Sequence, residues 1–237
     1  MNAQQLSYRL SRVASHVPKG AIVADIGSDH AYLPCFLVAE GLAERAIAGE
    51  VVKGPYESAK KQVRQEGLEQ RITVRLASGL AAIEEEDGVT VITIAGMGGP
   101  LIASILEQDK ALLVGVQRLI LQPNVHAKVI REWAAANSWR IIDEEILEEN
   151  SKIYEIIVLE PAQESVAFSE KELLFGPVLM VQRSPAFHTK WQREMAQWKK
   201  IVMSMEANAE AADIVEKKQE LTRKIKLVEE VLNSEIS

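Results

Sequence analysis

Residues 23–33, with the sequence VADIGSDHAYL, constrain the fold of this chain more than any other stretch. The apolar run at residues 21–24 that leads into them is typical of a strand buried on both faces. Residues 30–40 then carry apolar side chains at helical spacing. The pattern therefore predicts a strand, a tight turn and a helix.

The predicted turn has features of a nucleotide site. Gly27 tolerates a positive φ and close backbone approach, and the free amides at a helix start can hold a ligand. Asp25 closes the strand at the edge where open α/β sheets bind ligands. An ordinary strand-to-helix connection would also use a glycine, so the turn alone leaves both interpretations open. Asp29 stands where a dinucleotide fingerprint needs its second glycine, and Leu33 and Pro34 follow rather than a third glycine, which argues against NAD or FAD.

Composition narrows the class of protein. A chain of 237 residues, 47% of them hydrophobic, can form one large domain with an appendage. The formal net charge of -7 does not indicate a nucleic-acid binder, although it can hide local basic patches. The single cysteine, Cys35, has no partner for a disulfide, so we expect a cytoplasmic protein. We also expect no signal peptide, no lipid anchor and no membrane span.

An amphipathic helix is predicted at residues 3–16, where apolar side chains recur at helical spacing. Arg9 and Arg12 fall among its other positions. Such arginines more often form a solvated face than a ligand site, but both could contact phosphate.

Strand and helix patterns then alternate as far as residue 160. The predicted strands are residues 45–50, 71–76, 89–94 and 118–121, followed by an antiparallel pair at 139–142 and 152–159. The predicted helices are residues 55–66, 101–110 and 127–137. Seven strands in this order predict an α/β fold with a mostly parallel sheet and a closing hairpin.

Polar residues and glycines cluster where these strands end. Glu50 closes the second strand, where a carboxylate can accept from both hydroxyls of a ribose; a surface glutamate heading a helix is the alternative. The sequence AGMGG at residues 95–99 indicates close backbone approach to a ligand, or a turn required only by packing. Gln122 and Asn124 follow the fifth strand, and their amides suit a reader of base edges, although an asparagine before a helix is often only an N-cap.

The pattern changes beyond residue 161. A short helix is predicted at residues 168–175, and a break follows at Gly176-Pro177. Apolar residues then recur at alternating four- and three-residue steps, at Trp191, Met195, Trp198, Val202 and Met205, and again at Leu221, Ile225, Val228 and Leu232. This heptad pattern predicts an antiparallel coiled-coil hairpin with a turn between residues 208 and 213. We therefore expect two domains, residues 1–162 and 163–237.

The hairpin carries many basic residues, which its acids balance. This charged surface can be interpreted as a solvated coiled-coil face, as a dimer interface or as an RNA-binding strip. For the last of these, the candidate contacts are Lys190, Arg193, Lys199, Lys200 and Arg223.

Taken together, these motifs resemble a specific family. Asp25 and Gly27 match motif I of class I S-adenosylmethionine-dependent methyltransferases, which have a Rossmann-like fold. DIGSDHAYLP at residues 25–34, AGMGG at 95–99, QPN at 122–124 and the terminal hairpin are similar to the bacterial tRNA (adenine-22 N1)-methyltransferases of the TrmK family. The resemblance covers essentially the whole chain. The D/N-P-P-Y/F/W tetrapeptide of amino-methylating enzymes is absent.

The resemblance implies the ligands and the site. The donor is S-adenosyl-L-methionine, the product S-adenosyl-L-homocysteine and the acceptor adenine 22 in the D-loop of tRNA, with no metal. The implied donor-binding residues are Asp25, Gly27, Ser28, His30, Glu50, Ser78, Gly79, Ala95, Gly96 and Met97. The implied catalytic residues are Asp29, Gln122 and Asn124. The implied tRNA contacts are Arg9, Arg12, Tyr32 and the five hairpin cations named above.

The acceptor dictates the expected mechanism. Adenine N1 already has an in-plane lone pair, so the main task is to align it with the methyl sulfonium. Asp29 is expected to stabilise the cationic product ring. Because N1 lies on the Watson–Crick edge, the base must turn out of its stack into a pocket.

Two other functions are also compatible with the sequence. One is a small-molecule methyltransferase with a dimerising hairpin, and the other is a non-catalytic RNA-binding protein on the same scaffold. The second would need a blocked donor site, whereas Asp25, Gly27 and Glu50 are present. We expect a monomer rather than an obligate complex.

Overall fold

A seven-stranded sheet with the strand order β3-β2-β1-β4-β5-β7-β6 forms the centre of the molecule. The structure is a computed structural model and describes residues 4–164, 166–205 and 212–234. The strands are β1 (Ala21–Ile26), β2 (Ala43–Glu50), β3 (Ile72–Leu76), β4 (Val91–Gly98), β5 (Arg118–Val125), β6 (Trp139–Glu149) and β7 (Lys152–Pro161). Strands β1 to β5 are parallel, and β7 is antiparallel to both β5 and β6. The expected Rossmann-like sheet is confirmed.

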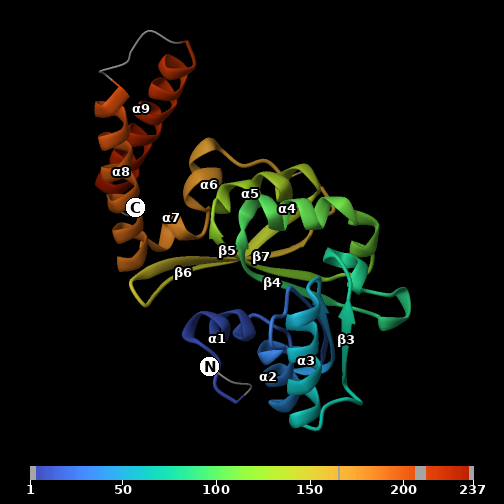
Figure 1. Cartoon of the computed structure of the whole chain (residues 1–237). Helices are drawn as coiled ribbons and strands as arrows, with labels where there is room; N and C mark the ends of the chain where they lie inside the picture. Colours follow the sequence, from blue (N-terminus) through green and yellow to red (C-terminus); the bar gives the residue numbers. More distant parts are fainter. Residues whose placement is uncertain (1–3, 165, 206–211, 235–237) are drawn as a thin grey trace.

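Helices cover both faces of this sheet (Figure 1). On one face lie α1 (Tyr8–Ser15), α2 (Tyr32–Ala39) and α3 (Lys53–Gln65); on the other lie α4 (Gly99–Gln108) and α5 (Ala127–Ala136). Short 3₁₀ turns follow β3 (η1, Gly79–Ala82, and η2, Glu85–Asp87) and α4 (η3, Lys110–Leu113). Val23 packs into the core between the sheet and α1, α2 and α3, and Ala24 packs into the core between the sheet and α4 and α5. Strand β1 is therefore buried on both faces, which explains its continuous apolar run. The strand order reverses between β1 and β4, and ligands of open α/β sheets bind at such a point.

Several boundaries differ from the predicted ones. Helix α1 begins at Tyr8 rather than at residue 3, because the Ser7 side chain accepts a hydrogen bond from the Leu10 amide and caps the helix there. Strand β4 continues through the glycine-rich segment as far as Gly98, pairing with β5 through two register shifts. Strand β6 continues to Glu149 rather than ending at residue 142, because it pairs with β7 over its whole length.

The carboxyl-terminal part consists of α6 (Glu170–Phe175), α7 (Leu179–Gln182), α8 (Pro185–Met205) and α9 (Ala212–Asn233). Helices α8 and α9 lie side by side and project away from the sheet (Figure 1). Four of the predicted seam residues are buried, namely Trp191, Leu221, Ile225 and Val228. The turn predicted between residues 208 and 213 falls mainly on residues outside the described ranges. The division into domains at residue 162 stays a prediction.

A buried ion cluster ties this part to the sheet. Arg131 on α5 donates to Glu144 Oε1 at 2.7 Å and to Glu155 Oε2 at 2.6 Å, and all three side chains are at most 3% exposed. Lys190 on α8 pairs with Glu155. Glu144 Oε2 also accepts from the Val178 amide at 2.9 Å. The start of the hairpin is therefore held to β6 and β7 by charges that compensate one another.

Candidate active site

Asp25 is fixed at the carboxyl end of β1. Its Oδ2 accepts from the Ser28 hydroxyl and its Oδ1 from the Thr93 hydroxyl, both at 2.6 Å. The residue is 5% exposed, and burial raises the pKa of its carboxyl despite these two hydrogen bonds. A buried carboxylate oriented in this way is prepared to accept further hydrogen bonds from a ligand.

The backbone after Asp25 turns through left-handed conformations. Gly27 has φ 72°, and a Cβ on it would lie 2.1 Å from Cε of Met97. Asp29 and Ala31 have φ 56° and 54°, so two of the positions where generic motif I has glycine keep a glycine-like conformation without glycine. The turn therefore has a left-handed residue at each of the three positions where motif I has glycine, although only Gly27 is a glycine.

Glu50, at the end of β2, reaches this turn. Its Oε1 accepts from the backbone N–H of Asp29, whereas its Oε2 has no hydrogen-bond partner among the described residues. The residue is 5% exposed, and burial raises the pKa of its carboxyl. Ser78 and Gly79 lie beside it, at the start of η1, because the preceding Ala77 amide donates to the Glu50 carbonyl at 2.8 Å.

A cavity of about 300 Å³ opens between the β1 turn, the end of β4 and α1. Nine of the expected site residues line it: Arg9, Asp25, Gly27, Ser28, Asp29, Tyr32, Ala95, Gly96 and Met97. Leu10 and Leu33 complete the wall. The expected donor-binding residues His30, Glu50, Ser78 and Gly79 do not line this cavity, although Glu50 is joined to it through Asp29.

A closed network of amides forms the end of β4 and β5. Oε1 of Gln122 accepts from the Gly96 amide at 3.0 Å and from Arg9, and its Nε2 donates to the Pro123 carbonyl at 2.9 Å. The same Nε2 lies 3.4 Å from Oδ1 of Asn124, whose Nδ2 donates to the Gly96 carbonyl at 2.7 Å. Gln122 is fully buried and its amide is used within the protein, so it differs from the expected base reader. Asn124 is exposed and keeps free donor and acceptor capacity.

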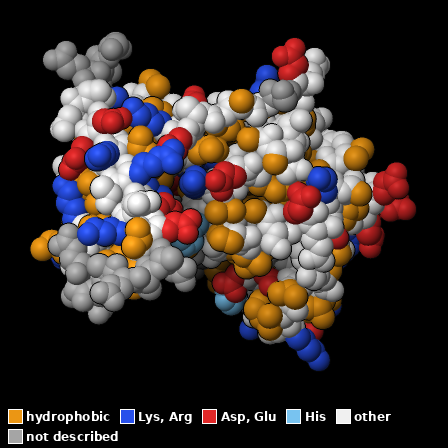
Figure 2. Space-filling model, turned by 90° about the horizontal axis from the view of Figure 1, so that it is seen from above, with side chains coloured by type: hydrophobic (Ala, Val, Ile, Leu, Met, Phe, Trp, Pro, Cys, Tyr) orange, Lys and Arg blue, Asp and Glu red, His pale blue; other side chains and the backbone are white. Residues whose placement is uncertain are grey.

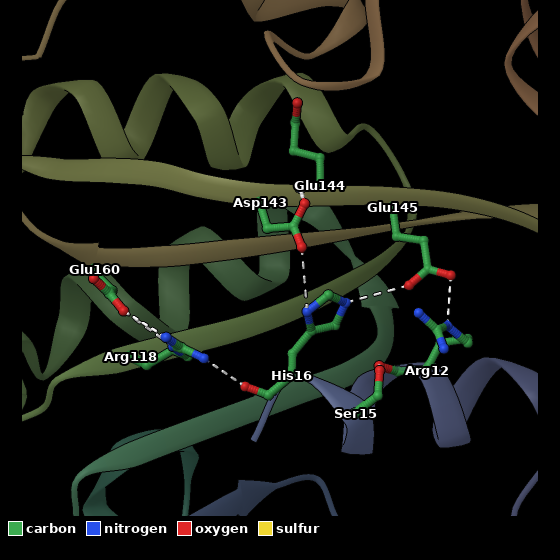
Figure 3. A network of polar contacts seen from close by, with 8 residues as sticks. All are labelled: Arg12, Ser15, His16, Arg118, Asp143, Glu144, Glu145 and Glu160. Atoms are coloured by element: carbon green, nitrogen blue, oxygen red, sulfur yellow. Dashed lines mark hydrogen bonds and ion pairs between the residues drawn. The ribbon is translucent and has the colours of Figure 1, made fainter. Parts of the chain in front are cut away.

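The two arginines of α1 have different surroundings. Arg12 Nε donates to Glu145 at 2.7 Å, in a network that also holds His16 between Asp143 and Glu145 (Figure 3). Glu144 points away from this network (Figure 3). Arg12 is thus neutralised by β6, whereas Arg9 lines the cavity.

His30 and Tyr32 lie next to each other where the turn leads into α2. Their rings stack with centroids 5.2 Å apart, and Nε2 of His30 is 3.7 Å from Oδ1 of Asp29. The Asp29 side chain is 68% exposed, so it is accessible to a substrate.

The hairpin cations divide into two groups. Lys190 and Arg193 line a larger groove of about 640 Å³ between the end of β5 and α8, together with Asn124 and Trp191. Lys199 pairs with Glu229, Arg223 pairs with Glu170, and Lys200 is exposed. Figure 2 shows basic and acidic side chains mixed over the hairpin end rather than one continuous basic strip.

Sequence reasoning missed two residues that shape the site. Thr93 orients Asp25, and only its position as a polar residue inside an apolar strand could have indicated a role. Tyr154 on β7 supports Arg9, with the guanidinium carbon 5.2 Å from its ring centroid. Nothing in the pattern around Tyr154 places it beside α1.

The described residues contain neither a metal-binding cluster nor a helix that could span a membrane. No group of three or more His, Cys, Asp and Glu side chains in that part of the chain could hold a metal ion. None of the helices in the same ranges has the length and apolar character needed to cross a membrane.

Comparisons with known proteins agree with the geometry. Residues 23–230 match the family model described as TrmK, tRNA (adenine(22)-N(1))-methyltransferase. The tRNA (adenine(22)-N(1))-methyltransferase of Bacillus subtilis (strain 168) is 44% identical, over 98% of this chain and 99% of that protein. The crystal structure of the B. subtilis M1A22 tRNA methyltransferase TrmK has a TM-score of 0.92 and 43% identity, over 97% of this chain and 100% of that one. Streptococcus pneumoniae Sp1610, solved in complex with S-adenosyl-L-methionine, has a TM-score of 0.88 and 48% identity, again over 97% and 100%.

Proposed function

Because the chain belongs to the TrmK family of tRNA (adenine(22)-N(1))-methyltransferases, we propose that it methylates N1 of adenine 22 in tRNA. S-adenosylmethionine is the methyl donor and S-adenosylhomocysteine the product. The observation that carries the proposal is the cavity in which the left-handed turn, Asp25 and Asp29 meet the end of β4. The accessible cavity also argues against a non-catalytic scaffold, which would need a blocked donor site.

The residues present fit the donor. Oε2 of Glu50 has no hydrogen-bond partner in the described part of the chain and can accept from a ribose hydroxyl, as expected for an acid at the end of the second strand. Asp25 is buried, and its orientation is set by Ser28 and Thr93. The Gly27 turn offers backbone where a side chain would collide with Met97.

The acceptor base is held by Asp29, Tyr32 and Met97, which line the same cavity. S-adenosylmethionine supplies an electrophilic methyl group on a sulfonium. Asp29, exposed at the cavity wall, stabilises the positive charge that develops on the adenine ring and orients its exocyclic amine. Tyr32 and Met97 provide apolar surface for a base turned out of its stack.

Asn124 is the amide that meets the base, and Gln122 positions it. Gly96 N–H and the Pro123 carbonyl fix the two ends of the Gln122 amide, because one can only donate and the other can only accept. Nε2 of Gln122 therefore faces Oδ1 of Asn124, and Nδ2 of Asn124 faces the Gly96 carbonyl. The remaining hydrogen of Nδ2 and a lone pair of Oδ1 are left for the substrate.

The groove between β5 and α8 is the proposed path of the tRNA. It adjoins Asn124 and carries Lys190 and Arg193, which can approach phosphates, together with Trp191 and Trp198, which offer aromatic surface. Lys199 and Arg223 do not line this groove, which makes them weaker candidates. We further propose that the protein acts in the cytoplasm, as a monomer.

Transfer of labelled methyl groups to unmodified tRNA transcripts tests the proposal. Wild-type protein is expected to form 1-methyladenosine, identified by mass spectrometry of the nucleosides, and a transcript with guanine at position 22 is expected to stay unmodified. Binding of S-adenosylhomocysteine without transfer to any tRNA would favour the small-molecule alternative. Equal methylation of both transcripts would exclude position 22 as the target.

A further inference from the structure

Arg9 is the one cationic side chain among the described residues that line the cavity. Its backbone N–H donates to Oε1 of Glu149 at 3.1 Å, its Nη1 donates to Gln122, and its guanidinium lies over the ring of Tyr154. Three contacts from three different strands therefore fix both the main chain and the head group of this residue.

None of the described carboxylates compensates the charge of Arg9. Within the described ranges no carboxylate lies at ion-pair distance from its guanidinium, whereas Arg12 on the same helix pairs with Glu145 at 2.7 Å. The contacts of Arg9 are a neutral amide and an aromatic ring, so its Nε and Nη2 donors are left over. A rigid guanidinium with free donors in a cavity wall is preorganised to bind a carboxylate or a phosphate.

The charges of the cavity indicate which anion fits. Besides Arg9 it is lined by two acids, Asp25 and Asp29, and it leaves out Glu50 and Ser78, the residues expected to meet ribose and adenine. The amino-acid part of S-adenosylmethionine carries an ammonium, a sulfonium and a carboxylate, and Arg9 is the cation of the described cavity wall that can pair with this carboxylate. We propose that Arg9 binds the carboxylate of the methyl donor, rather than a tRNA phosphate. This inference rests on the proposed function for the identity of the donor.

Two donor analogues separate these possibilities. Isothermal titration with S-adenosylhomocysteine, which has the carboxylate, and with 5′-methylthioadenosine, which lacks the whole amino-acid end, is carried out on the full chain. Arg9→Ala is expected to weaken the binding of S-adenosylhomocysteine roughly 10- to 100-fold and to leave the affinity for 5′-methylthioadenosine unchanged. Arg9→Lys should recover part of the loss, and Arg12→Ala should leave both donor affinities at the wild-type level.

Measurements with tRNA test the alternative that Arg9 contacts a tRNA phosphate. For Arg9→Ala the inference predicts an unchanged KM for tRNA and an unchanged dependence of tRNA binding on salt. A raised KM for tRNA with a shallower salt dependence, and wild-type affinity for S-adenosylhomocysteine, would overturn it in favour of a phosphate contact. An equal loss of affinity for both analogues would also overturn the inference, because such a result would give Arg9 a purely structural role through Gln122.

The outcome does not depend on the acceptor. If the wild-type protein binds S-adenosylhomocysteine but methylates no tRNA, the proposed function fails while the analogue comparison still decides the role of Arg9.

Discussion

The Thr93 hydroxyl donates to Oδ1 of Asp25 at 2.6 Å, across the parallel pairing of β4 and β1. Only a polar side chain at this register position can orient the buried carboxylate from that side. Asp25 would otherwise keep a single hydrogen bond, from Ser28. The orientation of the motif I acid thus depends on a neighbouring strand that lies 68 residues further along the chain.

Thr93→Val removes this hydrogen bond with little change of shape. We expect a loss of about 1–3 kcal/mol in the free energy of unfolding, since a buried acceptor loses a partner, and several-fold weaker binding of S-adenosylhomocysteine. Chemical denaturation and calorimetry measure the two effects. Thr73→Val makes the same change at an exposed position of β3 and should alter neither quantity. Equal behaviour of the two variants would show that the Thr93 contact is irrelevant.

Asp29 combines backbone strain with its proposed role. Its φ of 56° is disfavoured for residues with a Cβ, whereas glycine adopts it freely. Asp29→Gly is therefore expected to raise the free energy of unfolding by about 0.5–1 kcal/mol, and Asp29→Ala to lower it slightly. Both variants lack the carboxylate and should lose methyl transfer to a similar extent. A glycine variant less stable than the wild type would contradict this account of the turn.

Arg131 neutralises two buried acids. Replacing it by methionine keeps much of its volume but leaves Glu144 and Glu155 without their shared partner, and only Lys190 remains to compensate Glu155. The expected loss is about 3–5 kcal/mol in the free energy of unfolding. Arg140→Met, which removes an exposed arginine from its pair with Glu160, should cost less than about 1 kcal/mol. Denaturant titration compares the two variants, and similar losses would contradict the assigned role.

The pKa of the Glu155 carboxyl determines part of the dependence of stability on pH. Burial opposes its charge, but Lys190 and Arg131 outweigh burial and hold the pKa of its carboxyl below the ordinary value of 4.5. A lowered pKa in the folded state means that the stabilisation is complete above about pH 5 and is lost as the pH falls through the folded-state pKa. The difference in unfolding free energy between wild type and Glu155→Gln should be constant near neutral pH and shrink in acid. A difference that grows below pH 4.5 would have the wrong sign.

The sequence allowed much of the sheet and the donor end of the site to be predicted. Apolar runs and turn residues are local signals, so β1, Gly27 and Glu50 could be placed without knowing which strands pair. The length of β6 could not be predicted, because the second half of this strand is polar and is held by pairing with β7. The place of Gln122 was also hidden, since its burial depends on Arg9 from α1 and Gly96 from β4. Contacts of that kind join distant segments and leave no local pattern.

The central claim is that N1 of adenine 22 is the atom that receives the methyl group. A tRNA transcript with 1-deazaadenosine at position 22 tests it most directly, because a C–H group replaces N1 while the shape and the exocyclic amine of the base remain. The account predicts that this transcript receives no methyl group, while the matched adenosine transcript yields 1-methyladenosine at position 22. Methylation of the deaza transcript at its exocyclic amine would contradict the account.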